Sequence, residues 1–114
     1  MSKRPVELLL QDILDAVNKI ERYTKRISEG TFIKDEMRID AVARNLEIIG
    51  EAANQLPEDF RASHPEIEWN KIVGLRHRII HAYFGIDLKI IWQILKSDMP
   101  LFKKNIKRFC GKRR

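Results

Sequence analysis

The sequence predicts an all-α protein, an antiparallel bundle of roughly four to five helices. Apolar residues recur at intervals of three and four over most of the chain, which places them on one face of a helix. No segment shows convincing alternation of apolar and polar residues, so we expect no strands. A length of 114 residues suits one hydrophobic core, so residues 1–114 are predicted to form a single domain.

The first predicted helix runs from Val6 to Ile27. Its apolar residues form one continuous stripe, made of Val6, Leu9, Ile13, Ala16, Ile20, Tyr23 and Ile27. Pro5 suits a first helical turn, and Gly30 follows where a C-cap glycine would stand. We therefore expect this helix to have about six turns.

A second long helix is predicted to begin at Asp35, which can act as an N-cap, and to end before Pro57. Its apolar stripe consists of Ile39, Val42, Leu46, Ile49, Ala53 and Leu56. The two long helices are expected to form an antiparallel hairpin. Residues 57–68 contain two prolines and few periodic apolar residues, so they are predicted to be a connection with one short helical turn at most.

A third long helix is predicted to begin near Trp69 and to end around Phe84 and Gly85. Its buried side is expected to contain Ile72, Leu75, Ile79 and Ala82. Trp69 is interpreted as a core anchor rather than a platform on which bases stack.

The next predicted helix begins at Asp87, which can cap it, and Trp92 is again expected to be a core anchor. Its buried face would consist of Leu88, Ile91, Trp92 and Leu95. Pro100 then interrupts the apolar pattern. Either it kinks this helix, or it occupies the first turn of a new helix capped by Ser97 or Asp98.

Positive charge is concentrated at the C-terminal end, in a basic tail that starts at about residue 103. Seven basic residues and no acid lie between Met99 and Arg114, so the rest of the chain has a net charge of −1 against a total of +6. A basic tail can bind RNA phosphates. It can equally be a solvated chain terminus, and the sequence leaves both interpretations open.

Composition also bears on location and on metal binding. No segment approaches the roughly 20 apolar residues that cross a bilayer, and acidic residues occur where a secretory signal has its apolar centre. We therefore expect a cytoplasmic protein without membrane contact. Cys110 is the only cysteine, which excludes an internal disulfide and a cysteine zinc cluster.

The run from Arg76 to Tyr83 is the strongest candidate for chemistry, because it sets charged and imidazole side chains into an apolar helical stretch. Arg76 can bind a phosphate through two parallel donors, and His81 can take or give a proton near neutrality, a pair that suits RNA cleavage without a metal. No acid falls between Trp69 and Ile86, so Arg78 adds to a local positive charge suited to an RNA backbone.

Helical geometry does not bring this pair together on one straight helix. His81 lies five residues from Arg76 and therefore about 140° round the helix axis. Either the helix end distorts near His81, or the same segment of a second chain completes the pocket. We favour the second arrangement, which predicts a homodimer with two-fold symmetry and with this helix at the interface.

Two other groups of residues are weaker candidates, one for metal binding and one for acid–base catalysis. His77 and His81 have a spacing that can hold zinc, but no glutamate follows the first histidine and His64 is an uncertain third ligand, so no metal site is predicted. Glu47 and Glu51 are expected to be solvated or salt-bridged rather than catalytic.

The motif resembles a known family. Arg76, four residues, His81, one residue and Tyr83 resemble the Arg-x4-His-x-Tyr signature of HepT-like toxins in the HEPN superfamily. Residues 46–53, Trp69 and residues 83–87 are also similar to that family, so the resemblance extends from the first helix to about Leu101. It implies a HEPN-like helical bundle.

The resemblance further implies a metal-independent endoribonuclease toxin of a toxin–antitoxin system, with no cofactor. Arg76 and His81 would be the catalytic pair, and His77 would orient them or contact phosphate, as Arg78 would. The implied partners are a second copy of the chain, RNA, and an MntA-like nucleotidyltransferase antitoxin that adds AMP to Tyr83. The alternative is a non-catalytic helical dimer that docks a nucleotidyltransferase or binds nucleotide.

Overall fold

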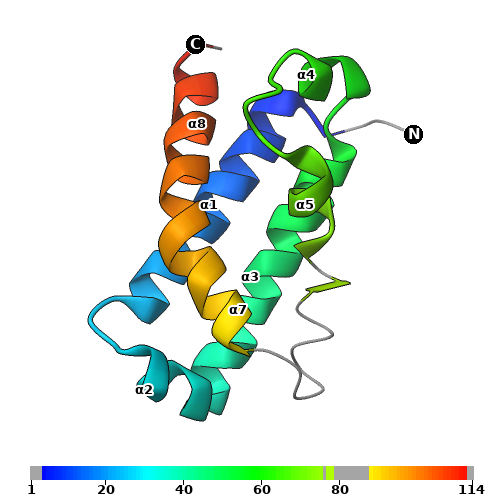
Figure 1. Ribbon diagram of the computed structural model, residues 1–114. Coiled ribbons are helices and arrows are strands. Elements are labelled where there is room, and N and C mark those ends of the chain that lie inside the picture. The colour runs from blue at the N-terminus through cyan, green and yellow to red at the C-terminus, as the bar shows by residue number, and fades with distance from the viewer. Residues whose placement is uncertain (1–3, 76, 79–87, 113–114) are drawn as a thin grey trace.

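The computed structural model describes residues 4–75, 77–78 and 88–112. In this part of the chain every regular element is helical, which confirms the predicted all-α class. Two long helices, α1 (Val6–Thr24) and α3 (Glu36–Gln55), lie side by side and antiparallel (Figure 1). The predicted helical hairpin is therefore confirmed.

A third helical stretch packs against this hairpin (Figure 1). It consists of α7 (Leu88–Gln93), the π-helical turn η1 (Ile94–Asp98) and α8 (Met99–Lys112). The α8 helix lies against α1. Five of the seven basic residues of the predicted tail are thus part of a packed helix.

Three short helices connect the longer ones. The α2 helix (Glu29–Lys34) joins α1 to α3 and contacts α7, and α5 (Trp69–Val73) packs against α3. The α4 helix (Glu58–Ala62) is the one short turn expected between residues 57 and 68. None of the helices in the described ranges is long and apolar enough to cross a membrane.

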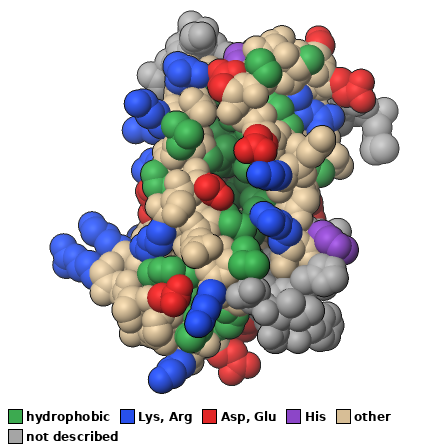
Figure 2. Space-filling view, viewed as in Figure 1, with side chains coloured by type: hydrophobic (Ala, Val, Ile, Leu, Met, Phe, Trp, Pro, Cys, Tyr) green, Lys and Arg blue, Asp and Glu red, His purple; other side chains and the backbone are tan. Residues whose placement is uncertain are grey.

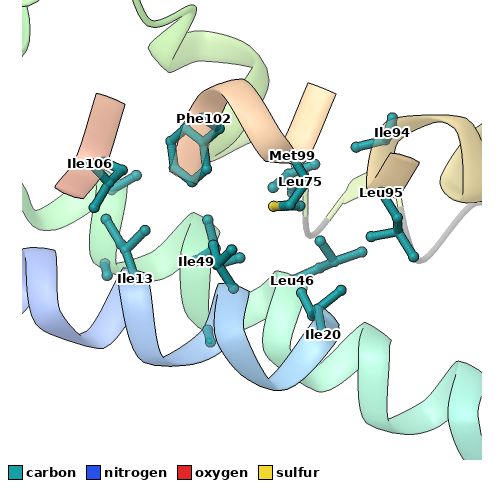
Figure 3. Packing of buried hydrophobic residues seen from close by; sticks show 14 of the residues in the cluster. Ile13, Ile20, Leu46, Ile49, Leu75, Ile94, Leu95, Met99, Phe102 and Ile106 are labelled. Atoms are coloured by element: carbon teal, nitrogen blue, oxygen red, sulfur yellow. The ribbon is translucent and has the colours of Figure 1, made fainter. Parts of the chain in front are cut away.

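The hydrophobic core lies where α1, α3 and the η1–α8 stretch meet. Figure 3 shows aliphatic side chains from these elements pointing toward one another, among them Ile13 of α1, Ile49 of α3 and Ile106 of α8, all fully buried. Leu75 reaches the same core from the segment that follows α5. Each long helix therefore buries the apolar stripe that its sequence predicts.

The prediction for the second long helix is confirmed at both of its ends. Asp35 is the N-cap of α3, and its side chain accepts a hydrogen bond from the backbone N–H of Arg38 at 3.1 Å. The helix ends at Gln55, with Leu56 in extended conformation ahead of Pro57. A capping side chain at one end and a proline beyond the other thus set the length of α3.

The predicted end of the first helix is wrong. The α1 helix stops at Thr24 rather than continuing to Ile27, and Arg26 has a positive φ of 64° that turns the chain. Ser28 then starts α2 by accepting a hydrogen bond from the N–H of Thr31. Gly30 is consequently a residue of α2 and not a C-cap.

Neither alternative offered for Pro100 describes the chain fully. Ser97 and Asp98 do not cap a new helix, because both belong to η1, which leads directly into α8. The N–H of Met99 bonds the carbonyl of Ile94, five residues earlier, as in a π-helix. Since proline has no N–H and its ring crowds the preceding turn, a widened turn before Pro100 lets the helix continue.

The predicted third long helix is only partly described. Its first turns form α5, and Gly74 follows as a C-cap with helical dihedral angles. Its continuation to Phe84 and Gly85 lies outside the described residues, as does the expected cap at Asp87.

Candidate functional site

Only part of the predicted site belongs to the residues that the structure describes. Arg76, His81 and Tyr83 lie outside them, so the structure neither joins nor separates the expected catalytic pair. His77 and Arg78 are described, and both are exposed. The geometry of the site is therefore that of the chain leading into the motif and of the surface around Arg78.

The α5 helix, which leads into the motif, is held at its first residue. Trp69 is 8% exposed, and its indole Nε1 donates a hydrogen bond to the carbonyl oxygen of His64 at 3.0 Å. An indole that is both buried and hydrogen-bonded fixes the direction in which the chain leaves it. The prediction that Trp69 is a core anchor is confirmed.

One helical turn follows α5 and orients the two described motif residues. The N–H of Arg78 bonds the carbonyl of Gly74 at 3.1 Å, and Leu75 is only 3% exposed. With Leu75 in the core, His77 and Arg78 lie on the outer side of the turn. A Cβ at Gly74 would lie 3.2 Å from the carbonyl oxygen of Asn70, so glycine suits this close approach.

A groove of about 210 Å³ lies beside this turn, between α5 and the η1–α8 stretch. Its lining is mainly apolar, with Ile72 and Leu75 on one wall and Phe102 on the other. Figure 2 shows hydrophobic side chains in this hollow, with acidic and basic side chains along its rim. Arg78 and Lys71 both line the groove, so it opens next to the motif.

The charges on the groove's rim are not equivalent. Lys71 is paired with Glu68, with 3.0 Å between the Nζ and Oε2 atoms. Arg78 has no carboxylate within ion-pair distance among the residues that the structure describes. Among these residues, no carboxylate competes with an anionic ligand for the Arg78 guanidinium.

Asn105 is a groove residue that the sequence analysis missed. It is 7% exposed, lines the groove, and has no hydrogen-bond partner in the described part of the chain. An amide in this position can both donate and accept hydrogen bonds. The signal was a polar residue placed inside the apolar stripe that Phe102 and Ile106 define.

The alternative catalytic and metal-binding groups receive no support from their surroundings. His64 packs between two phenyl rings, 4.6 Å from the ring centre of Phe60 and 4.0 Å from that of Phe109. Glu47 lies 3.8 Å from Arg44, and Glu51 is exposed, as expected of surface carboxylates. No group of three His, Cys, Asp or Glu side chains suited to a metal occurs within the ranges described.

The second tryptophan is also structural. Trp92 is half-buried, with its ring centre 5.3 Å from that of Phe32 in α2, and the Nζ of Lys96 lies 4.7 Å from the Trp92 ring centre. It links α7 to α2 rather than offering a free face to a base.

The fold and the motif together define a class, a small domain that is helical throughout its described ranges, contains an Arg–His–Arg run in its sequence and presents Arg78 beside an open groove. The chain belongs to the HepT-like ribonuclease family. The model of that family, described as "Ribonuclease HepT-like", matches residues 13–109. The resemblance seen in the motif is confirmed, and the match includes most of α8.

Relatives with similar names support this membership. "Putative RNase MJ1380" of Methanocaldococcus jannaschii is 46% identical over 106 residues, which cover 93% of this chain and 97% of the relative. "Probable ribonuclease HepT" of Thermococcus cleftensis is 43% identical over 101 residues, covering 89% and 92% of the two chains. No solved structure shows a significant match.

Proposed function

We propose that this protein is a metal-independent endoribonuclease in which Arg76 and His81 cleave RNA. The observation that supports the proposal most is the complete Arg-x4-His-x-Tyr sequence inside the span that matches the HepT-like ribonuclease family. The described surroundings fit an anionic substrate, because Arg78 is exposed beside a groove and has no ion pair with any described residue.

The proposed reaction needs no group besides the RNA and the two side chains. The 2′-hydroxyl oxygen attacks the adjacent phosphorus and loses its proton to a base, while the bond to the 5′-oxygen of the next nucleotide breaks and that oxygen gains a proton. His81 handles a proton in this exchange, and Arg76 stabilises charge on the phosphoryl oxygens. The products are a cyclic phosphate and a 5′-hydroxyl. Cleavage of labelled RNA in the presence of a chelator, by wild type and by variants of the pair, tests the proposal.

We further propose that the protein acts as a two-fold symmetric homodimer with the motif at the interface. A second copy would supply the group that a single straight helix cannot place, since His81 lies about 140° from Arg76. Light scattering is expected to give twice the chain mass of 13.5 kDa. A particle with the mass of one chain, at the concentration at which RNA is cleaved, would contradict the dimer.

The partner proposed for regulation is an MntA-like nucleotidyltransferase antitoxin that adds AMP to Tyr83. In this toxin–antitoxin arrangement, the added nucleotide would place bulk and negative charge beside Arg76 and thereby block a phosphate from binding there. After incubation with the cognate transferase and ATP, intact-mass spectra are expected to show one AMP per chain and cleavage is expected to stop.

The matched variant for this experiment is Tyr83→Phe, which removes only the hydroxyl. It is expected to gain no AMP and, if it still cleaves RNA, to remain active with the transferase present. An adduct of equal yield on Tyr83→Phe would show that another residue is modified.

A further inference from the structure

The charge of α8 differs from that of the other long helices. The α8 helix contains basic residues and no acid, namely Lys103, Lys104, Lys107, Arg108 and Lys112. The sequences of α1 and α3 each contain more acidic than basic residues. Net positive charge is therefore concentrated on α8, and Figure 2 shows basic side chains along the edge where α8 runs.

Two of these basic residues form contacts that join α8 to its neighbours. Lys103 Nζ lies 2.7 Å from the carboxylate of Glu21 in α1. Arg108 Nη2 lies 2.7 Å from the carboxylate of Glu66, in the connection between α4 and α5. The backbone N–H of Glu66 is the main cause that holds the pKa of the Glu66 carboxyl below its usual value, and the neighbouring His64 and Arg108 add to it. A structural role accounts for both basic residues.

Lys104 and Lys107 have no such role. Both are exposed, and neither has an ion pair or hydrogen bond in the described part of the chain. At 100° per residue, Lys104 and Lys107 lie about 60° apart round the helix axis, between the ion-paired Lys103 and Arg108. Lys104 and Lys107 therefore form one cationic face between the two ion pairs, which we call the α8 basic face.

The α8 basic face continues from the groove beside the motif. Leu101 lines the groove and is 62% exposed, and Lys104 lies one helical turn further along α8. Arg78 lines the same groove from the opposite wall. A chain of phosphates that passes Arg78 can thus cross the rim at Leu101 and continue along α8.

We propose that the α8 basic face binds the phosphate backbone of single-stranded RNA outside the catalytic motif. The inference rests on the proposed ribonuclease function, which supplies RNA as the anion. A membrane surface fits less well, because an interfacial helix needs an exposed apolar face. The apolar face of α8 is in the core, where Phe102, Ile106 and Phe109 are buried.

Binding of an RNA that cannot be cut tests this inference separately from catalysis. The probe is a short, fluorescein-labelled single strand of 2′-O-methyl RNA, whose binding is followed by fluorescence anisotropy over a range of salt concentrations. The test variant is Lys104→Gln with Lys107→Gln. Since each phosphate contact contributes about 0.7 to the salt slope of a single strand, the slope is expected to fall by about 1.4 and the affinity about tenfold at low salt.

The matched control changes the net charge equally outside the α8 basic face. Lys25→Gln with Lys34→Gln removes two exposed lysines, one directly after α1 and one in α2, neither of which has an ion pair among the described residues. This variant is expected to bind the probe within about twofold of wild type at the same salt, since it loses no phosphate contact. Circular dichroism checks that both variants are folded.

The outcomes separate the two proposals. Equal losses in both variants, no loss in either, or no measurable binding by wild type would overturn the α8 basic face as an RNA site. A loss confined to the α8 variant supports it, even if wild type fails to cleave RNA, in which case the ribonuclease proposal alone fails. If anionic vesicles bind the α8 face more tightly than the RNA probe does, the inferred partner is wrong.

Discussion

Replacing His81 or Arg76 by alanine is expected to abolish RNA cleavage in the presence of a chelator. Loss of a general acid–base group lowers rates by about 10²–10⁴-fold. Loss of a group that stabilises transition-state charge lowers them by about 10²–10³-fold. The measurement is cleavage of an end-labelled RNA by purified wild type and by each variant, with analysis of the product ends for cyclic phosphate and 5′-hydroxyl.

The matched control is Arg44→Ala, which removes an exposed arginine of α3 that pairs only loosely with Glu47. It is expected to cleave at the wild-type rate. Equal cleavage by wild type, Arg76→Ala and His81→Ala would refute the assignment of the pair. If wild type and both variants are folded and inert on several RNAs, a non-catalytic dimer that docks a nucleotidyltransferase becomes the better interpretation of the protein.

A mixture of the two inactive variants tests the shared cleft in the same assay. If Arg76 of one chain works with His81 of its partner, a mixed dimer contains one intact site. Part of the activity then returns when the variants exchange subunits. Continued inactivity of a mixture in which mixed dimers are shown to form would mean that each chain holds both residues of its own site.

Replacing Phe109 by alanine is expected to lower the free energy of unfolding by about 3–5 kcal/mol. Phe109 is 1% exposed, and its ring lies against His64 and, at 6.0 Å between centres, against Phe60 of α4. Removal of the ring would leave a cavity between α8 and α4. Urea unfolding followed by circular dichroism measures the change.

Lys107→Ala is the control in the same helix, and its effect is expected to stay within about 0.5 kcal/mol because the side chain is exposed. This comparison tests one of the two interpretations that the sequence left open for the C-terminal segment, the solvated chain terminus. If Phe109→Ala were as mild as Lys107→Ala, the segment would be a solvated terminus in solution rather than part of the core.

The sequence predicted α3 well because several local signals agree there. The Asp35 cap, the apolar stripe and Pro57 all indicate the same helix. The end of α1 was missed because Ile27 keeps the apolar spacing after the helix has stopped, and it still packs against the core. Periodicity records which side chains are buried and does not show where the backbone leaves the helix.

The candidate site likewise has one part that the sequence reveals and another that it does not. The motif depends on residue types at a fixed spacing, so the sequence alone could reveal Arg76 and His81. The groove joins Leu75 to Phe102 and Asn105, which are far apart in the chain, so only the placement of α5 opposite η1 and α8 reveals it. The α8 basic face required structure as well, since only the ion pairs of Lys103 and Arg108 distinguish them from Lys104 and Lys107.

The π-helical turn η1 closes its hydrogen bond over five residues, where an α-helix closes it over four. It therefore takes up one extra residue while the side chains of α8 keep the directions that they would have after an ordinary turn. Deletion of one residue from Ile94–Asp98 is expected to leave Phe102 and Phe109 in the core, whereas deletion of one residue within α8 would rotate the residues beyond it by about 100°. Length differences within the family are therefore expected to be tolerated better in η1 than in the first turns of α8.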